Sequence, residues 1–142
     1  MCVDVLRCAI LGLSAIVLTA AFAGADDTAA YDTVRAAPRF AAGPVGYAGA
    51  TSREEVALHE LLSQPTASRD LRRLLSEATI AGRLYALWGL AVVEDADFPK
   101  LSEKYSATDT DVDTMKGCLV ERETVSSIVN RIRAGQYGRP TN

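Results

Sequence analysis

The sequence predicts an all-α domain of about five helices, and two kinds of observation support this. Apolar residues recur at i, i+3, i+4 and i+7 in one segment after another, which is the spacing of helices with one buried face. Helix start and stop signals frame these segments: Ser52 and Asp97 precede two of them, and Gly135 follows the last. A minor β-hairpin is expected near 112–121, between the last two helices.

The first helix is expected to begin after Ser52. Ser52 is a candidate N-cap, and Glu55, three residues later, can satisfy a second free backbone N–H group. Leu58, Leu61 and Leu62 supply the apolar face, and Pro65 ends the pattern.

A second helix is expected from about Thr66 or Ser68 to Ala78. Leu71, Leu74 and Leu75 lie on its apolar face, and a boundary near Thr79 leads into the next helix. The sequence leaves open whether a tight turn or a kink separates the two helices.

The segment 78–93 is predicted to be the central helix. Its only charged residue between Thr79 and Val93 is Arg83, as expected of a helix covered on most sides. Gly82 and Gly89 lie one heptad apart on a side of small residues. Either another helix approaches closely there, or two glycines are simply tolerated.

Two more helices complete the pattern. Asp97 is a candidate N-cap for a fourth helix, with Pro99 in its first turn. The last helix is expected from about residue 123 to 134, ending at Gly135, and residues 139–142 are expected to fray.

The segment AGRLYALWGL, followed by an acidic turn and a helix from Asp97, resembles one unit of HEAT-like or armadillo-like helical repeats over about residues 67–106. The resemblance implies a right-handed stack of helix pairs and a binding role. A non-repeat helical bundle is the alternative.

The N-terminus has the layout of a secretory signal. An almost wholly apolar run from Cys8 to Ala23 is followed by small residues, so residues 1–25 are predicted to be a cleaved signal peptide, although Asp4 is atypical. The alternative is an uncleaved membrane anchor. Residues 26–50, rich in Ala, Gly and Pro, are predicted to be a disordered linker, which makes residues 51–138 the folded domain.

Charge and cysteine content narrow the function classes. The net charge of −3 does not favour a nucleic-acid partner. Without the signal only Cys118 remains, so the thiol is either buried or available for an intermolecular link. Its neighbours Gly117, Leu119 and Val120 favour burial.

No catalytic or cofactor-binding pattern is visible. His59 and Cys118 offer the one possible Cys–His pair, but His59 is expected on a solvated helix surface. Asp109, Asp111 and Asp113 have the spacing that opens a calcium-binding loop. Thr114 stands where such a loop has glycine, so a solvated loop is the favoured interpretation and no metal or other cofactor is expected.

Arg69, Arg72 and Arg73 form the candidate partner-binding surface, because they share one face of the second predicted helix. The alternative is a solvated face on which Arg73 and Glu77 form an i, i+4 ion pair.

These patterns favour an exported, non-enzymatic helical domain, periplasmic or secreted, that binds an unknown protein partner. One alternative is a small enzyme whose carboxylates converge only in the fold. Another is a membrane-anchored domain that keeps its N-terminal segment. A deep pocket of titratable groups would favour the enzyme, and an exposed apolar patch would favour the binding domain.

Overall fold

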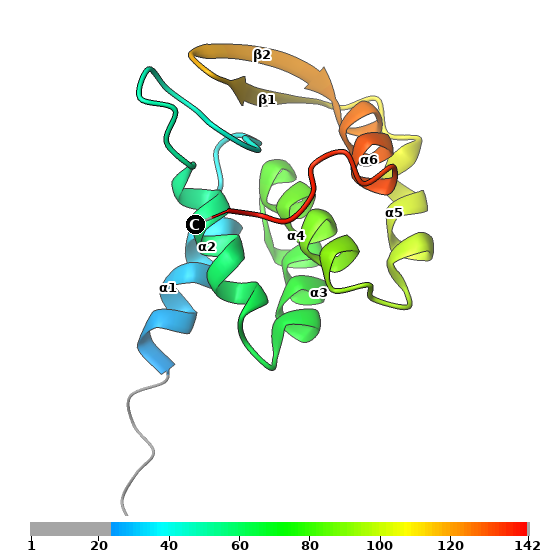
Figure 1. Ribbon diagram of the computed structural model, residues 1–142. Coiled ribbons are helices and arrows are strands. Elements are labelled where there is room, and N and C mark those ends of the chain that lie inside the picture. The colour runs from blue at the N-terminus through cyan, green and yellow to red at the C-terminus, as the bar shows by residue number, and fades with distance from the viewer. Residues whose placement is uncertain (1–23, 142) are drawn as a thin grey trace, which may run out of the picture.

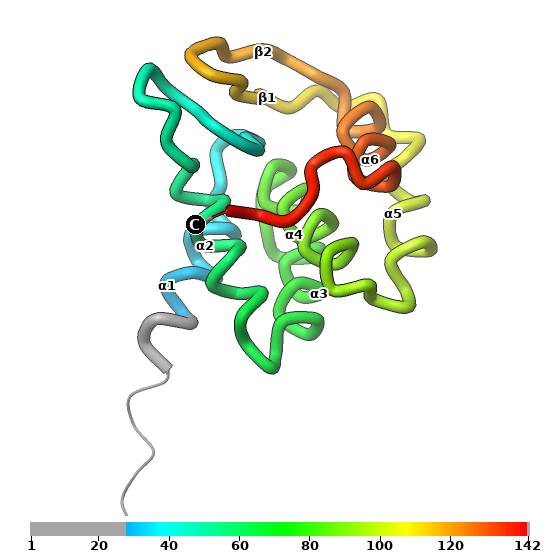
Figure 2. Tube along the Cα trace, viewed as in Figure 1, coloured from blue at the N-terminus to red at the C-terminus, as the bar shows by residue number. Residues whose placement is uncertain are grey.

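The computed structural model describes residues 24–141. This part of the chain is mostly α-helical, with one two-stranded antiparallel hairpin (Figures 1 and 2). In chain order the elements are α1 (Gly24–Arg35), α2 (Arg53–Leu62), α3 (Ala67–Glu77), α4 (Ile80–Val92), α5 (Phe98–Ser106), β1 (Asp111–Lys116), β2 (Leu119–Thr124) and α6 (Val125–Arg133). The predicted signal peptide lies almost entirely outside the described residues.

Helix α4 occupies the centre of the molecule, as its composition predicts. Every residue from Leu84 to Leu90 is buried, and the other helices of the described part surround α4 (Figure 1). Such a helix needs apolar or small residues on all sides, and its one charged residue, Arg83, is only half-buried.

The two glycines of α4 lie at close helix contacts, which confirms the packing interpretation. A Cβ on Gly82 would collide with the carbonyl oxygen of Val34 at the end of α1. A Cβ on Gly89 would lie 2.8 Å from one methyl group of Leu71 in α3. Each glycine therefore lets another helix approach more closely than alanine would.

Helix α3 and helix α4 are separate helices joined by a turn. Ala78 has an extended backbone, with ψ 163°, and so ends α3. The Thr79 hydroxyl then accepts the N–H of Gly82 and caps α4.

One of the two hydrogen bonds predicted at the N-terminus of α2 is present. The Ser52 hydroxyl accepts the N–H of Glu55, as expected. The Glu55 side chain does not return to Ser52. It is 1% exposed and accepts hydrogen bonds from the backbone N–H groups of Gly43 and Thr141, at 2.8 and 3.0 Å. Glu55 thus links α2 to two segments that are distant in the sequence.

The prediction of a disordered linker over residues 26–50 is wrong. Helix α1 packs against α2, and Val34 and Phe40 are 0% and 2% exposed. The Tyr85 hydroxyl accepts the N–H of Ala41 and donates to its carbonyl oxygen. Burial raises the pKa of Tyr85 to about 12, so this hydroxyl stays protonated at neutral pH. The segment has few large aliphatic residues, but small residues and the ring of Phe40 are buried in their place.

The hairpin is longer than predicted and belongs to the domain. Its register runs from Asp111 opposite Thr124 to Lys116 opposite Leu119. Phe40 lies along the other edge of β1, where its backbone bonds to Asp113 O and Met115 N at 2.8 and 3.0 Å.

The C-terminal segment is docked, so the prediction that it frays is wrong over residues 139–141. Pro140 is buried, and the Trp88 indole N–H donates to the carbonyl oxygen of Gly138 at 2.8 Å. Pro140 O also lies 3.3 Å from His59 Nδ1, so His59 is half-buried against this segment and not fully solvated. Gly135, with φ 69°, ends α6 as predicted and turns the chain back toward α4.

Candidate functional site

The hairpin turn and a loop before α2 together form a projecting end of the molecule, which we call the hairpin tip and define as residues 44–50 and 116–120. Gly117, with φ 56°, occupies the first central position of the two-residue hairpin turn. Its carbonyl oxygen accepts the N–H of Gly46 at 2.8 Å, and its N–H donates to Pro44 O at 3.3 Å. These bonds hold the loop beside the turn.

Large apolar side chains are exposed at the hairpin tip. Tyr47 is fully exposed, and Leu119 and Val120 are 66% and 54% exposed. Among the described residues the only other exposed large hydrophobic is Ile80, which lies elsewhere, at the start of α4. All three side chains therefore lie on two adjacent segments at one end of the molecule, and exposed apolar surface is a feature of interaction sites.

Strand β2 pairs with β1 along one edge, and its other edge is open in the described part of the chain. The backbone groups of Asp113 and Met115 face Phe40, so those of their antiparallel partners, Arg122 and Val120, face the opposite edge. No described segment pairs with that edge (Figure 1). Unpaired N–H and C=O groups on an edge strand can receive another extended chain.

The prediction that Cys118 is buried is wrong: the thiol is exposed. Cys118 is the second residue of the hairpin turn, where the chain reverses away from the core. It lies on a different element from His59, and no hydrogen bond joins the two in the described residues. The structure therefore does not assemble the Cys–His pair that the sequence allows.

Arg72, from the candidate arginine surface, is engaged within the fold. Its guanidinium binds both carboxylate oxygens of Asp95, with its closest approach at 2.7 Å, and also lies 2.7 Å from Asp97. Burial alone would raise the pKa of Asp95, but the hydrogen bonds from Arg72 and from the Asp97 N–H lower it below its usual value. Asp97 holds the N-cap position of α5 but makes no side-chain cap bond.

Arg69 and Arg73 also have partners. Arg69 lies 3.2 Å from Asp70, and the predicted i, i+4 pair between Arg73 and Glu77 is present at 3.4 Å. Arg73 also lies over the ring of Tyr31, whose hydroxyl donates to Glu77. All three arginines are exposed, and each one is paired with a carboxylate.

The three aspartates of the predicted polar loop do not converge on one point. Asp109 precedes β1, whereas Asp111 and Asp113 belong to it and are exposed. Asp113 pairs with Arg122 across the hairpin at 3.4 Å. Within residues 24–141, no group of three His, Cys, Asp or Glu side chains is placed to hold a metal ion.

Comparison with known protein families, with curated proteins and with solved structures found no match for this chain. None of the helices in the described part is long and apolar enough to cross a membrane. The sequence did not identify the hairpin tip as a site. In the sequence, Leu119 and Val120 after Gly117 indicate one half of a small hairpin and favour burial of Cys118, but they do not indicate a binding site.

Proposed function

We propose that this chain is an exported, non-enzymatic helical domain that binds a protein partner through the hairpin tip. The observation that carries the proposal is the position of Tyr47, Leu119 and Val120, which expose apolar surface at one end of the molecule. Exposed apolar surface raises the free energy of the isolated protein, and a partner that covers it removes that cost.

The open edge of β2 favours a protein over other partners. An extended peptide could bond to the backbone of Val120 and Arg122 while its side chains contact Leu119 and Val120. Nucleic acid is not favoured, because the chain is acidic overall and Glu121 lies on the same strand. The alternative of an enzyme with converging carboxylates finds less support, because the exposed feature is apolar.

We assign the helices to a small bundle around α4 rather than to a HEAT-like stack. In a solenoid each helix pair contacts only its neighbours in sequence. Here α4 contacts α1, α2, α3, α5 and α6. This arrangement supports binding through the hairpin tip and not through the concave face of a repeat array.

Export is the second part of the proposal, with retention of the N-terminal segment as a membrane anchor as its alternative. Removal of the predicted signal would leave a chain that begins near Gly24 or Asp26. N-terminal sequencing of the protein purified from the cell envelope tests this. An intact Met1 would reject cleavage and support the anchor.

The binding proposal is tested by placing a photo-crosslinking phenylalanine derivative at Tyr47 or Leu119 in the native host. The matched control carries the same group at Glu60, which is exposed on α2. We expect the same protein to be crosslinked from both tip positions and not from the control. Equal crosslinking from all three positions would reject the tip as the contact surface.

A purified partner then allows a quantitative test. The double variant Leu119→Thr, Val120→Thr places β-branched residues, which favour strands, at both positions and removes apolar surface. We expect its affinity to fall at least tenfold, because the core of an interface carries most of its binding energy. Unchanged affinity would reject the proposal. Tip-dependent binding to lipid vesicles without any protein would replace the protein partner with a membrane.

A further inference from the structure

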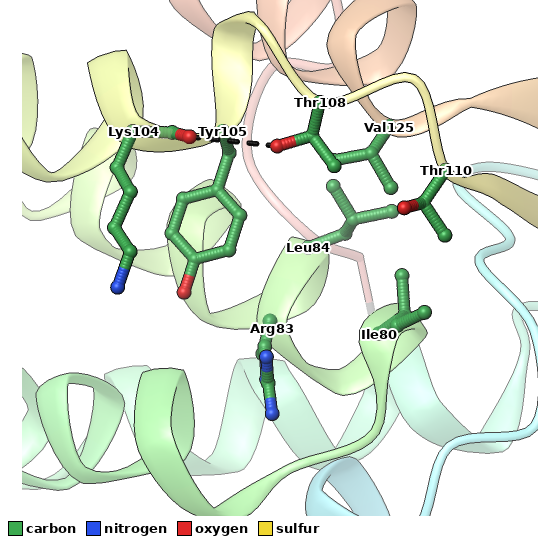
Figure 3. Close-up of a pocket in the computed structure, with 8 residues that line it drawn as sticks. All are labelled: Ile80, Arg83, Leu84, Lys104, Tyr105, Thr108, Thr110 and Val125. Carbon is green, nitrogen blue, oxygen red and sulfur yellow. Dashed lines mark hydrogen bonds between the residues drawn. The ribbon is translucent and has the colours of Figure 1, made fainter.

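A pocket with one apolar side and one cationic side opens between α4, α5 and the start of α6 (Figure 3). Its volume is about 260 Å³, and its lining residues are Ile80, Arg83, Leu84, Lys104, Tyr105, Thr108, Thr110 and Val125. It lies near the base of the hairpin, so it is distinct from the hairpin tip, and nothing in the proposed function depends on it.

Three aliphatic residues form the apolar side of the pocket. Leu84 and Val125 are 0% and 1% exposed and belong to the core. Ile80, the first residue of α4, is 41% exposed, so part of its side chain faces solvent beside the pocket. A ligand with an apolar body would cover this surface.

Two cations define the other side. Neither Arg83 nor Lys104 has a carboxylate within ion-pair distance among the described residues, although the arginines of α3 are all paired. Arg83 uses Nε to donate to Ala78 O at 3.0 Å, which leaves its terminal nitrogens available. The polar ends of Lys104 and Tyr105 point the same way (Figure 3), and the Tyr105 hydroxyl donates to Leu75 O at 3.3 Å.

The lining is not neutralised by acids. No aspartate or glutamate lines the pocket. Asp109 and Asp111 flank Thr110 in the sequence but are not among its lining residues. Two unpaired cations beside an apolar wall match a ligand that carries one anionic group on a short apolar body.

We propose that this pocket binds a small amphipathic carboxylate. The carboxylate would lie between Lys104 and Arg83, and the apolar body would lie against Leu84 and Ile80. Liquid water occupies about 30 Å³ per molecule, so the pocket has room for about nine non-hydrogen atoms. This size suits a medium-chain fatty acid or an aromatic acid.

Hexanoate is the probe, titrated into the isotope-labelled protein while amide chemical shifts are recorded. We expect saturable shifts confined to the start of α4, the end of α5 and the start of α6. Hexanol and hexylamine have the same number of carbon atoms without the negative charge, and we expect each to bind at least tenfold more weakly. Equal binding of all three would reject the cationic side as a carboxylate site.

Lys104→Glu is the decisive variant, because the Lys104 side chain makes no hydrogen bond or ion pair with any other residue in the described part of the chain. Lys100→Glu is the matched control: it changes the net charge equally on the same helix, and Lys100 does not line the pocket. We expect Lys104→Glu to weaken hexanoate binding at least tenfold and Lys100→Glu to change it less than twofold. Equal effects of the two variants, or shifts outside the pocket, would overturn the proposal.

Discussion

Gly82→Ala tests the close contact between α1 and α4. The new methyl group would collide with the Val34 carbonyl oxygen and lie 2.8 Å from Ala78 Cβ. Helix α1 cannot simply move away, because the Arg35 and Ala37 carbonyl oxygens accept hydrogen bonds from Thr79 N–H and Oγ1 at 3.0 and 2.7 Å. Relief of the collision therefore requires these bonds to lengthen or break.

The expected magnitude follows from two opposing terms. Alanine favours a helix interior over glycine by about 1 kcal/mol. Overpacking costs about 1–3 kcal/mol, and a fixed backbone oxygen puts Gly82 at the upper end of this range. We expect the free energy of unfolding to fall by about 2 kcal/mol, which lowers the urea midpoint by about 1 M.

Urea denaturation followed by circular dichroism measures this change, and hydrogen exchange of the α1 amides locates it. Gly89→Ala is the comparison, because the atoms it would meet are the methyl groups of Leu71 and Leu58, which can shift. We expect a smaller loss there, of about 1 kcal/mol or less. Gly82→Ala with unchanged or increased stability would refute the reasoning.

Three further predictions concern other elements. Native Cys118 should react with a thiol reagent as fast as in denaturant, since it is exposed; slow labelling would contradict the structure. The folded pKa of Asp95 is lowered, so its ion pair with Arg72 stabilises the fold above the unfolded pKa of about 4, and this stability is lost as pH falls through the folded value. Arg72→Ala should therefore lower the urea midpoint at pH 7, and the difference between its midpoint and that of the wild type should be smaller at pH 3. An equal difference in midpoint at both pH values would argue against this linkage. Deleting residues 137–142 should shift the fluorescence of Trp88, the only tryptophan, to longer wavelength and lower the Tm; an unchanged spectrum would show that the segment does not cover it.

Most helices could be predicted because their signals are local. Leu71 and Leu74 are both fully buried, as their spacing predicts, and the same holds for Ile128 and Val129 of α6. The caps at Ser52 and Gly135 also depend only on neighbouring residues. Within residues 24–141, periodicity and capping therefore predicted every helix except α1.

Helix α1 and the segment after it could not be predicted because their stability comes from distant residues. Val34 is buried against a glycine of α4, and Phe40 pairs with Thr114 of β1. A composition of Ala, Gly and Pro has no local mark that separates such a segment from a linker.

The candidate sites could be predicted only in part for the same reason, because they depend on contacts between residues that are distant in the sequence. Spacing predicted that Arg72 shares a face with its neighbours, but not that Asp95, 23 residues later, binds it. Leu119 and Val120 are consecutive, so in a strand they point to opposite faces. Both are exposed because the end of the hairpin extends beyond the helices, which only the tertiary structure shows.

The hydrogen bonds of Glu55 have a consequence for the order of assembly during synthesis. One carboxylate oxygen accepts from Gly43, 12 residues earlier, and the other accepts from Thr141, 86 residues later. A growing chain, emerging from its N-terminal end, can complete the first bond early but must wait for residue 141 to complete the second. Until then Glu55 needs water on one oxygen, so its final burial follows the emergence of residue 141. A nascent domain that lacks its C-terminal residues is therefore expected to stay open around α2.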